Sequence, residues 1–107
     1  MTREEALNSV VRYERPLEML RNALAPWPWD WDSAPIAHVS NDAVRNVIRR
    51  YLAGDLSAAD VEEWANLLEV REDVDFEPAA ASAIFDLANP ELEGALPVLA
   101  AKILDSL

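Results

Sequence analysis

The sequence contains no cysteine, only two glycines and a single histidine. Without cysteine there is no disulfide framework, thiolate metal site or cysteine nucleophile, and this composition fits a reducing compartment. Two glycines are too few for the many tight turns of an all-β sandwich or barrel. No apolar run approaches the roughly 18 residues of a membrane span, and the start "MTREEAL" lacks the apolar stretch of a secretory signal. These absences predict a helical, cytoplasmic protein that does not enter membranes.

The remaining composition is that of one folded domain. The chain has 107 residues, of which 51% are hydrophobic, and this is enough for one core without metals or disulfides. No internal repeat, low-complexity tract or linker divides it. We therefore expect a single helical domain over residues 1–107, an all-α bundle of about five helices.

Helical periodicity is clear in the first half of the chain. Residues 2–24 carry apolar side chains at helical spacing behind a possible cap at Thr2, and Pro16 interrupts the pattern. We expect a kink, or two helices that meet near Glu14–Pro16. Residues 40–55 form a continuous apolar stripe that starts after a cap at Ser40 or Asn41. The predicted helix ends at Gly54, the position expected for a glycine in the left-handed conformation that caps a helix C-terminus.

The second half shows the same kind of signal. Residues 56–73 start a new helix, with Ser57 as the cap and Asp60 at its third position. The connection from Gly54 is so short that the two helices must be neighbours. Residues 74–107 carry two more helices, one starting at Pro78 and the other at about Pro97.

The stretch "APWPWDWDSAP" (25–35) is the main irregular segment, since its prolines forbid a regular helix. Trp27, Trp29 and Trp31 alternate, so an extended backbone would send all three rings to one side. The rings either cover the helical core, which we favour, or form an aromatic platform for a partner. On the second reading Trp29 and Trp31 are candidate binding residues.

The net charge of −11 comes entirely from the second half of the sequence. Residues 1–54 hold seven basic and seven acidic residues, whereas residues 55–107 hold thirteen acidic and two basic ones. A surface of this kind repels phosphate backbones and attracts basic proteins. We therefore expect no direct binding of nucleic acid.

Nine acidic residues and one basic residue lie between Asp55 and Glu77. This acidity either keeps the protein in solution or attracts a basic partner. Like charges this close cost stability, whereas spread charges would give the same solubility, so the clustering favours a partner. The affinity would come from apolar anchors such as Trp64, Phe76 or a tryptophan of the 25–35 segment. The candidate acidic binding residues are Asp60, Glu62, Glu63, Glu69, Glu72, Asp73, Asp75 and Glu77.

Catalytic signatures are missing from the sequence. Neither glycine belongs to a phosphate-binding loop, and the single histidine, His38, falls in a segment expected to be a loop. Ser33, Ser40 and Asp42 lie near it in sequence, but no nucleophile-elbow pattern accompanies them. We expect no catalytic residue, no cofactor and no enzymatic activity.

A designed metal site is not expected either. Asp73, Asp75 and Glu77 alternate like the first ligands of an EF-hand loop. Position 6 of that loop would be Pro78 instead of glycine, and position 12 would be Ile84 instead of glutamate. Zinc would need nearly all its ligands from carboxylates, because there is one histidine and no cysteine.

The segment "IRRYLAGDLSAADVEEWA" (48–65) resembles the helix–"GxxSA"–helix signature of small, colicin-D-like bacterial immunity proteins. The resemblance implies a helical bundle whose acidic face binds a toxin nuclease domain and blocks its active site. "WANLLE" (64–69) and "ANPEL" (88–92) resemble segments of uncharacterised small bacterial proteins, from which no function follows. The matching residues of the immunity signature are Leu52, Gly54, Leu56, Ser57, Ala58, Val61 and Trp64.

The sequence thus supports one leading hypothesis and two alternatives. The leading one is a non-enzymatic binding protein, of the immunity or antitoxin type, that occludes a basic protein such as a nuclease toxin. The first alternative is a structural or regulatory helical protein that forms a homodimer through its tryptophans. The second is an enzyme for a small cationic substrate, which would need inward-facing carboxylates with perturbed pKa values.

Overall fold

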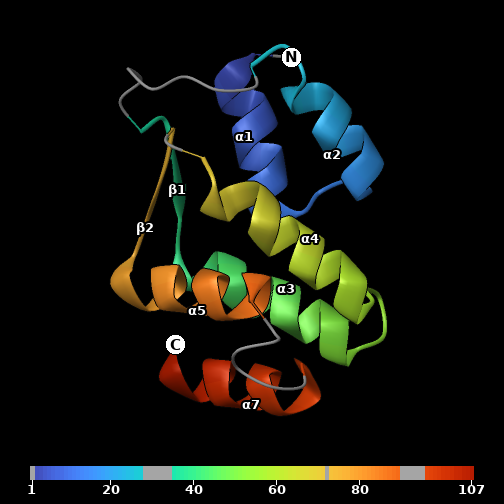
Figure 1. The fold of residues 1–107 in the computed structure, drawn as a ribbon, viewed down its shortest axis with the longest axis vertical. Coiled ribbons are helices and arrows are strands. Elements are labelled where there is room, and N and C mark those ends of the chain that lie inside the picture. The colour runs from blue at the N-terminus through green and yellow to red at the C-terminus, as the bar shows by residue number, and fades with distance from the viewer. Residues whose placement is uncertain (1, 28–34, 72, 90–95) are drawn as a thin grey trace.

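The computed structural model describes residues 2–27, 35–71, 73–89 and 96–107. Within these residues the chain forms six helices and one two-stranded parallel sheet (Figure 1). The Cα radius of gyration is 13.1 Å, close to the value of about 13 Å for a compact domain of 100 residues. The elements are α1 (Arg3–Arg12), α2 (Leu17–Leu24), β1 (Ala37–Val39), α3 (Asn41–Leu52), α4 (Ala58–Glu69), β2 (Val74–Phe76), α5 (Pro78–Ala88) and α7 (Leu96–Ser106).

The expected break in the first helical segment is confirmed, because α1 and α2 are separate helices on either side of Glu14–Pro16. The Thr2 hydroxyl accepts the Glu5 N–H and caps α1. At the other end Tyr13 adopts a left-handed conformation with φ 51°, which is unusual for a residue other than glycine. Arg50 of α3 supports this turn: its Nη1 donates to the Tyr13 carbonyl at 2.7 Å, and its guanidinium lies over the Tyr13 ring.

The connection between α3 and α4 also forms as expected. Gly54 follows α3 with φ +88°, and its N–H donates to the Tyr51 carbonyl while the Asp55 N–H donates to the Arg50 carbonyl. These two bonds satisfy carbonyls that the helix end leaves free. A Cβ at Gly54 would contact nothing within 4 Å, so the backbone conformation alone calls for glycine there. The cap and the short connection place α3 and α4 side by side.

The described residues are mostly helical, as expected, but the parallel pairing of β1 with β2 adds a short sheet that the all-α prediction lacked. Their six helices correct the count of about five. His38 lies in β1 rather than in a loop, and the alternation of acids around Asp75 is strand periodicity. Side chains on either side of His38, Ala37 and Val39, are buried, and Val74 is buried in β2. A strand sends alternate side chains to opposite faces, so the short sheet covers the core with one face and exposes His38 and Asp75 on the other.

The core surrounds α4, which crosses the middle of the molecule in Figure 1 with α1 and α2 above it and α5 and α7 below. Trp64 of α4 is completely buried, and its Nε1–H donates to the Val10 carbonyl of α1 at 2.6 Å. The two expected C-terminal helices are present as α5 and α7. Two of their large apolar side chains point outward, since Phe85 of α5 is 48% and Val98 of α7 is 74% exposed.

Candidate protein-binding surface

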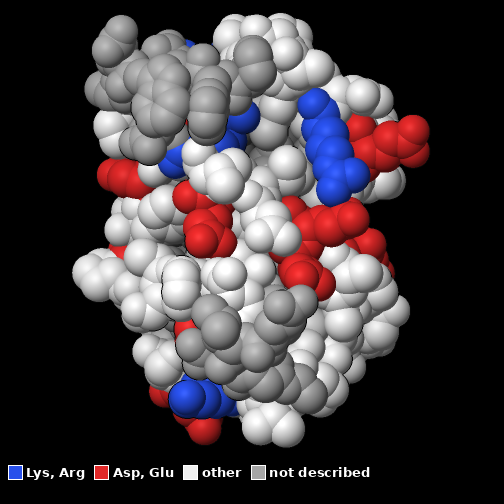
Figure 2. Space-filling view, in the orientation of Figure 1, with Lys and Arg blue, Asp and Glu red and all other residues white. Residues whose placement is uncertain are grey.

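Six of the eight candidate acidic residues lie on α4 and on or beside β2, with their carboxylates outside the core. Figure 2 shows acidic side chains gathered across the middle of one face, over α4, with basic side chains near them. Glu72, Trp29 and Trp31 lie outside the described residues. We refer to the six as the α4–β2 carboxylates: Asp60, Glu62, Glu63, Glu69, Asp75 and Glu77.

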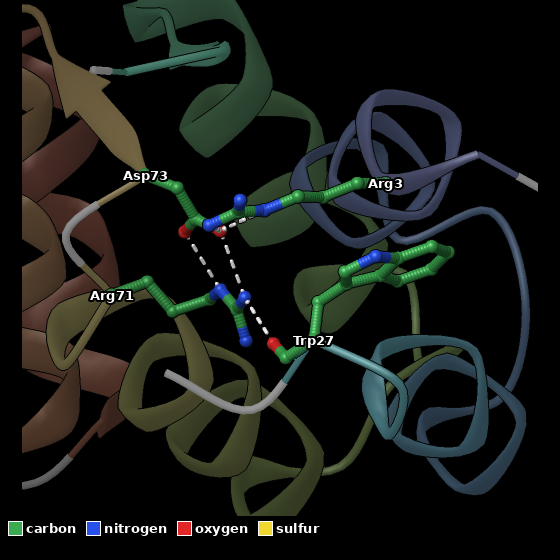
Figure 3. Close-up of polar contacts among 4 residues, drawn as sticks. All are labelled: Arg3, Trp27, Arg71 and Asp73. Carbon is green, nitrogen blue, oxygen red and sulfur yellow. Dashed lines mark hydrogen bonds and ion pairs between the residues drawn. The ribbon is translucent and has the colours of Figure 1, made fainter. Parts of the chain in front are cut away.

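Asp73 does not belong to this surface, although the sequence placed it there. Its side chain is only 2% exposed and is held between two arginines (Figure 3). The Arg3 Nη2 lies 2.9 Å from Oδ2, and the Arg71 Nε and Nη2 lie 2.8 Å from Oδ1 and Oδ2. Arg71 Nη2 also donates to the Trp27 carbonyl at 2.7 Å. The carboxylate of Asp73 therefore joins α1, the end of α4 and the segment after α2.

The environment of Asp73 favours its ionised form. Burial alone would raise the pKa of this carboxyl, but the hydrogen bonds and charges of Arg71 and Arg3 outweigh burial and lower the pKa below its ordinary value. Removing one partner of a buried pair of this kind destabilises a fold, and a carboxylate engaged by two arginines offers no free oxygen to a binding partner.

The remaining carboxylates differ in how far they are already engaged. Asp60 Oδ2 accepts the Ser57 N–H at 2.9 Å and completes the capping box of α4. Glu63 pairs with Arg21 of α2 at 3.0 Å, and both side chains are about half exposed. Glu62 and Glu69 form no ion pair or side-chain hydrogen bond with any residue of the described part. These two, seven residues apart on α4, lie on the same side of the helix and are free to meet a cation.

His38 contacts carboxylates that are distant in sequence. Its Nδ1 lies 2.6 Å from Asp75 Oδ1, and its Nε2 lies 3.9 Å from Glu77 Oε1. The contact with Asp75 follows from the strand register, which places His38 opposite Asp75. The polar residues near His38 in sequence bind other groups: the Ser40 hydroxyl caps α3, and the Asp42 carboxylate pairs with Arg45.

The serine–histidine–aspartate arrangement considered from the sequence is therefore not assembled at Ser40 and Asp42. Ser33, its other possible member, lies outside the described residues.

No group of three potential metal ligands occurs in the described part of the chain. Among the same residues no helix has the length and apolar character needed to cross a bilayer.

The apolar anchors of a binding surface are not those expected. Trp64 is 0% exposed, so this side chain cannot insert into a partner, and Phe76 is half-buried against the core. Val70, which follows α4 directly after Glu69, is instead 62% exposed. The exposure of Val70 could have been predicted from the helical periodicity, because Val70 falls outside the buried stripe of Val61, Trp64 and Leu68.

Comparisons of the chain with protein-family models, with curated proteins and with solved structures give no match. The resemblance to immunity proteins, which covers residues 48–65, therefore stays a prediction. Within the described residues, the surface offers two glutamates without an ion pair, four further carboxylates and an exposed valine.

Proposed function

We propose that this chain is a small, non-enzymatic binding protein whose α4–β2 carboxylates engage a basic protein. The observation that carries the proposal is the state of Glu62 and Glu69, which lie on one side of α4 without any ion pair in the described part of the chain. Val70, exposed at the end of the same helix, supplies apolar area that a partner would cover. Charge would guide the partner and select it, and contacts of the apolar kind would supply affinity.

A basic protein fits this surface better than a nucleic acid does. Phosphates would be repelled by a chain of net charge −11, whereas lysine and arginine side chains would be attracted. The resemblance of residues 48–65 to colicin-D-like immunity proteins suggests a more specific form, in which the partner is a nuclease toxin domain and its active site is occluded. A toxin gene immediately upstream of the gene for this protein would support that form.

The test compares two variants with the same change in net charge. In the first, Glu62, Glu63 and Glu69 are replaced by glutamine; in the second, Glu4, Glu18 and Asp105 are replaced by their amides. The probe is a fluorescent oligo-arginine peptide, and binding is measured by anisotropy at low and at physiological salt. We expect the first variant to lose about tenfold in affinity at low salt and the second to lose about twofold or less.

Equal losses in the two variants would contradict the proposal, because they would show that binding follows net charge rather than the position of the carboxylates. Thermal unfolding of both variants serves as the control for folding. Pull-down of a candidate toxin domain with the same pair of variants extends the test from the peptide to a protein.

One observation favours the alternative of a homodimer. Phe85 and Val98 are exposed on α5 and α7, and these two helices pack against each other. Large apolar side chains of this kind occur at interfaces as well as singly on ordinary surfaces. Sedimentation over a wide range of protein concentrations decides: a protein that remains monomeric throughout removes this alternative.

A further inference from the structure

A hollow of about 310 Å³ lies between the connection from α1 to α2 and the connection from α3 to α4, and we call it the Tyr13 hollow. Pockets that bind small ligands measure about 300–1,000 Å³, so this one has the volume for a single side chain. Asp60, one of the α4–β2 carboxylates, lines it. The Tyr13 hollow therefore adjoins the surface proposed above to bind a basic protein.

Tyr13 brings a polar group without a partner to this hollow. The residue is only 4% exposed, and its hydroxyl forms no hydrogen bond with any residue of the described part. Burial and the charge of Asp60 raise the pKa of Tyr13 to about 12, so the hydroxyl stays protonated at neutral pH and lies near a carboxylate that lines the hollow. A neutral hydroxyl oxygen can accept a hydrogen bond from a ligand.

Two carboxylates that line the Tyr13 hollow also have oxygens left to accept hydrogen bonds. Asp55 is exposed and forms no ion pair or side-chain hydrogen bond with a described residue. Asp60 uses Oδ2 for the Ser57 N–H, and its Oδ1 has no such partner among the same residues. With the tyrosine hydroxyl, these oxygens form a set of acceptors that come from the end of α1, the connection after α3 and the first turn of α4.

The apolar residues Pro16, Leu17 and Leu56 also line the hollow. A side chain with an aliphatic stem and a cationic head suits such a wall, because the stem lies against apolar surface while the head reaches the oxygens. Lysine fits better than arginine. Its compact ammonium can turn three donors toward acceptors from separate elements, whereas the planar guanidinium suits acceptors that lie in one plane.

The balance of charge in the wall favours a cation. Three carboxylates and two guanidiniums line the hollow, those of Glu14, Asp55, Asp60, Arg15 and Arg50. The guanidinium of Arg50 is already engaged, because its Nη1 donates to the carbonyl at the end of α1 and the group lies over the tyrosine ring. Arg15 is exposed, so its charge is the one that opposes the entry of a cation.

We propose that the Tyr13 hollow receives the side chain of one lysine of the basic partner, whose ammonium binds the Tyr13 hydroxyl, Asp55 and Asp60. This inference rests on the proposed function, because it names where on that surface a single partner side chain is recognised. The other α4–β2 carboxylates attract the partner by charge alone, whereas the hollow selects one side chain by its hydrogen bonds.

The experiment measures the anisotropy of a fluorescent oligo-lysine peptide with wild type, Tyr13→Phe and Tyr51→Phe at low salt. Tyr13→Phe removes one oxygen and keeps both the net charge and the ring beside Arg50. Tyr51, the only other tyrosine, does not line the hollow and serves as the matched control. We expect Tyr13→Phe to weaken binding about threefold to tenfold, as for one lost hydrogen bond, and Tyr51→Phe to bind like wild type.

Two changes of charge test the sign of the hollow with the same peptide. Asp55→Asn should weaken binding about threefold, and Asp105→Asn, the same change at an exposed carboxylate of α7, should weaken it less than twofold. Arg15→Gln should strengthen binding about twofold, because it removes a charge that opposes the ammonium. Weaker binding in Arg15→Gln would overturn the proposal, since it would show that the hollow attracts anionic groups.

If Tyr13→Phe and Asp55→Asn bind oligo-lysine as tightly as their controls, the Tyr13 hollow is not a lysine site. The proposed function then still stands, provided that replacing Glu62, Glu63 and Glu69 by glutamine weakens binding more than its own control does. Equal losses in that pair remove the proposed function and this inference with it. An equal loss for oligo-lysine and oligo-arginine in Tyr13→Phe would overturn the choice of lysine. Thermal unfolding confirms that each variant is folded.

Discussion

At the scale of single residues, Asp73 connects more segments than any other side chain described above. Its carboxylate binds Arg3 and Arg71, and its carbonyl accepts the Ile36 N–H at 2.9 Å. Replacing Asp73 by asparagine leaves two guanidiniums facing a neutral amide in a site shielded from water. We expect Asp73→Asn to lower the free energy of unfolding by about 3 kcal/mol, as for other broken buried pairs. Urea denaturation measures the loss.

The matched control is Asp55→Asn, which makes the same chemical change at an exposed carboxylate without an ion pair in the described part of the chain. Its effect should stay within about 0.5 kcal/mol. A similar small effect for Asp73→Asn would show that the two arginines find other partners, and the connecting role assigned to Asp73 would be wrong.

The sequence alone could not separate Asp73 from its acidic neighbours. It stands between Glu72 and Asp75 in the most acidic part of the chain, where a carboxylate is expected to lie on a solvated surface. Arg3, one of its two partners, lies 70 positions away. Only the tertiary arrangement brings Arg3 to it. Local composition therefore predicts an exposed Asp73, which is wrong, whereas its acidic neighbours Asp75 and Glu77 lie outside the core.

At the scale of elements, the capping box of α4 fixes where the acidic helix begins. The Ser57 hydroxyl accepts the Asp60 N–H at 3.1 Å, and the Asp60 carboxylate accepts the Ser57 N–H at 2.9 Å. We expect Ser57→Ala to destabilise the protein by about 1 kcal/mol, because the Asp60 N–H in the first turn of the helix loses its acceptor. Ser82→Ala, an exposed change inside α5, should cost nothing, since alanine favours helices. Thermal unfolding of both variants distinguishes a cap from a general effect of losing a hydroxyl.

Helices and strands differed in how well the sequence predicted them, for a physical reason. Caps, apolar stripes and prolines are local signals. They predict the break between α1 and α2 near Pro16, the end of α3 at Gly54, and the starts of α4 at Ser57 and α5 at Pro78. The β1–β2 pair has only three residues in each strand and joins segments about 37 residues apart. Its stability comes from pairing and burial rather than local preference, so the sequence around His38 carries no strand signal and predicts a loop.

At the scale of the whole molecule, a net charge of −11 on 107 residues opposes compaction. Added sodium chloride screens this repulsion, and we expect it to raise the free energy of unfolding by about 1 kcal/mol between low and high ionic strength. Urea is the suitable denaturant, since guanidinium is itself a salt. The variant with Glu62, Glu63 and Glu69 replaced by glutamine should gain less. A wild-type protein that salt destabilises would mean that its ion pairs outweigh the repulsion.

Acid acts on the whole molecule through two opposing effects, and Asp73 allows them to be separated. Protonation of the surface carboxylates relieves repulsion, whereas protonation of Asp73 breaks its pairs with Arg3 and Arg71. Because folding lowers the pKa of Asp73, its contribution to stability is complete above the pKa of the unfolded carboxyl. That contribution is lost as the pH falls through the lower pKa of the folded state.

The difference in unfolding free energy between wild type and Asp73→Asn should therefore stay constant from neutral pH to about pH 5. Below about pH 4, where an unfolded aspartate takes up its proton, the difference should shrink. The relief of surface repulsion occurs equally in both proteins and cancels from the comparison. Urea titrations of the two proteins at each pH provide the measurement. A difference that instead persists unchanged to the lowest pH at which both proteins fold would mean that asparagine disturbs packing, and that the charge of Asp73 is not what stabilises this site.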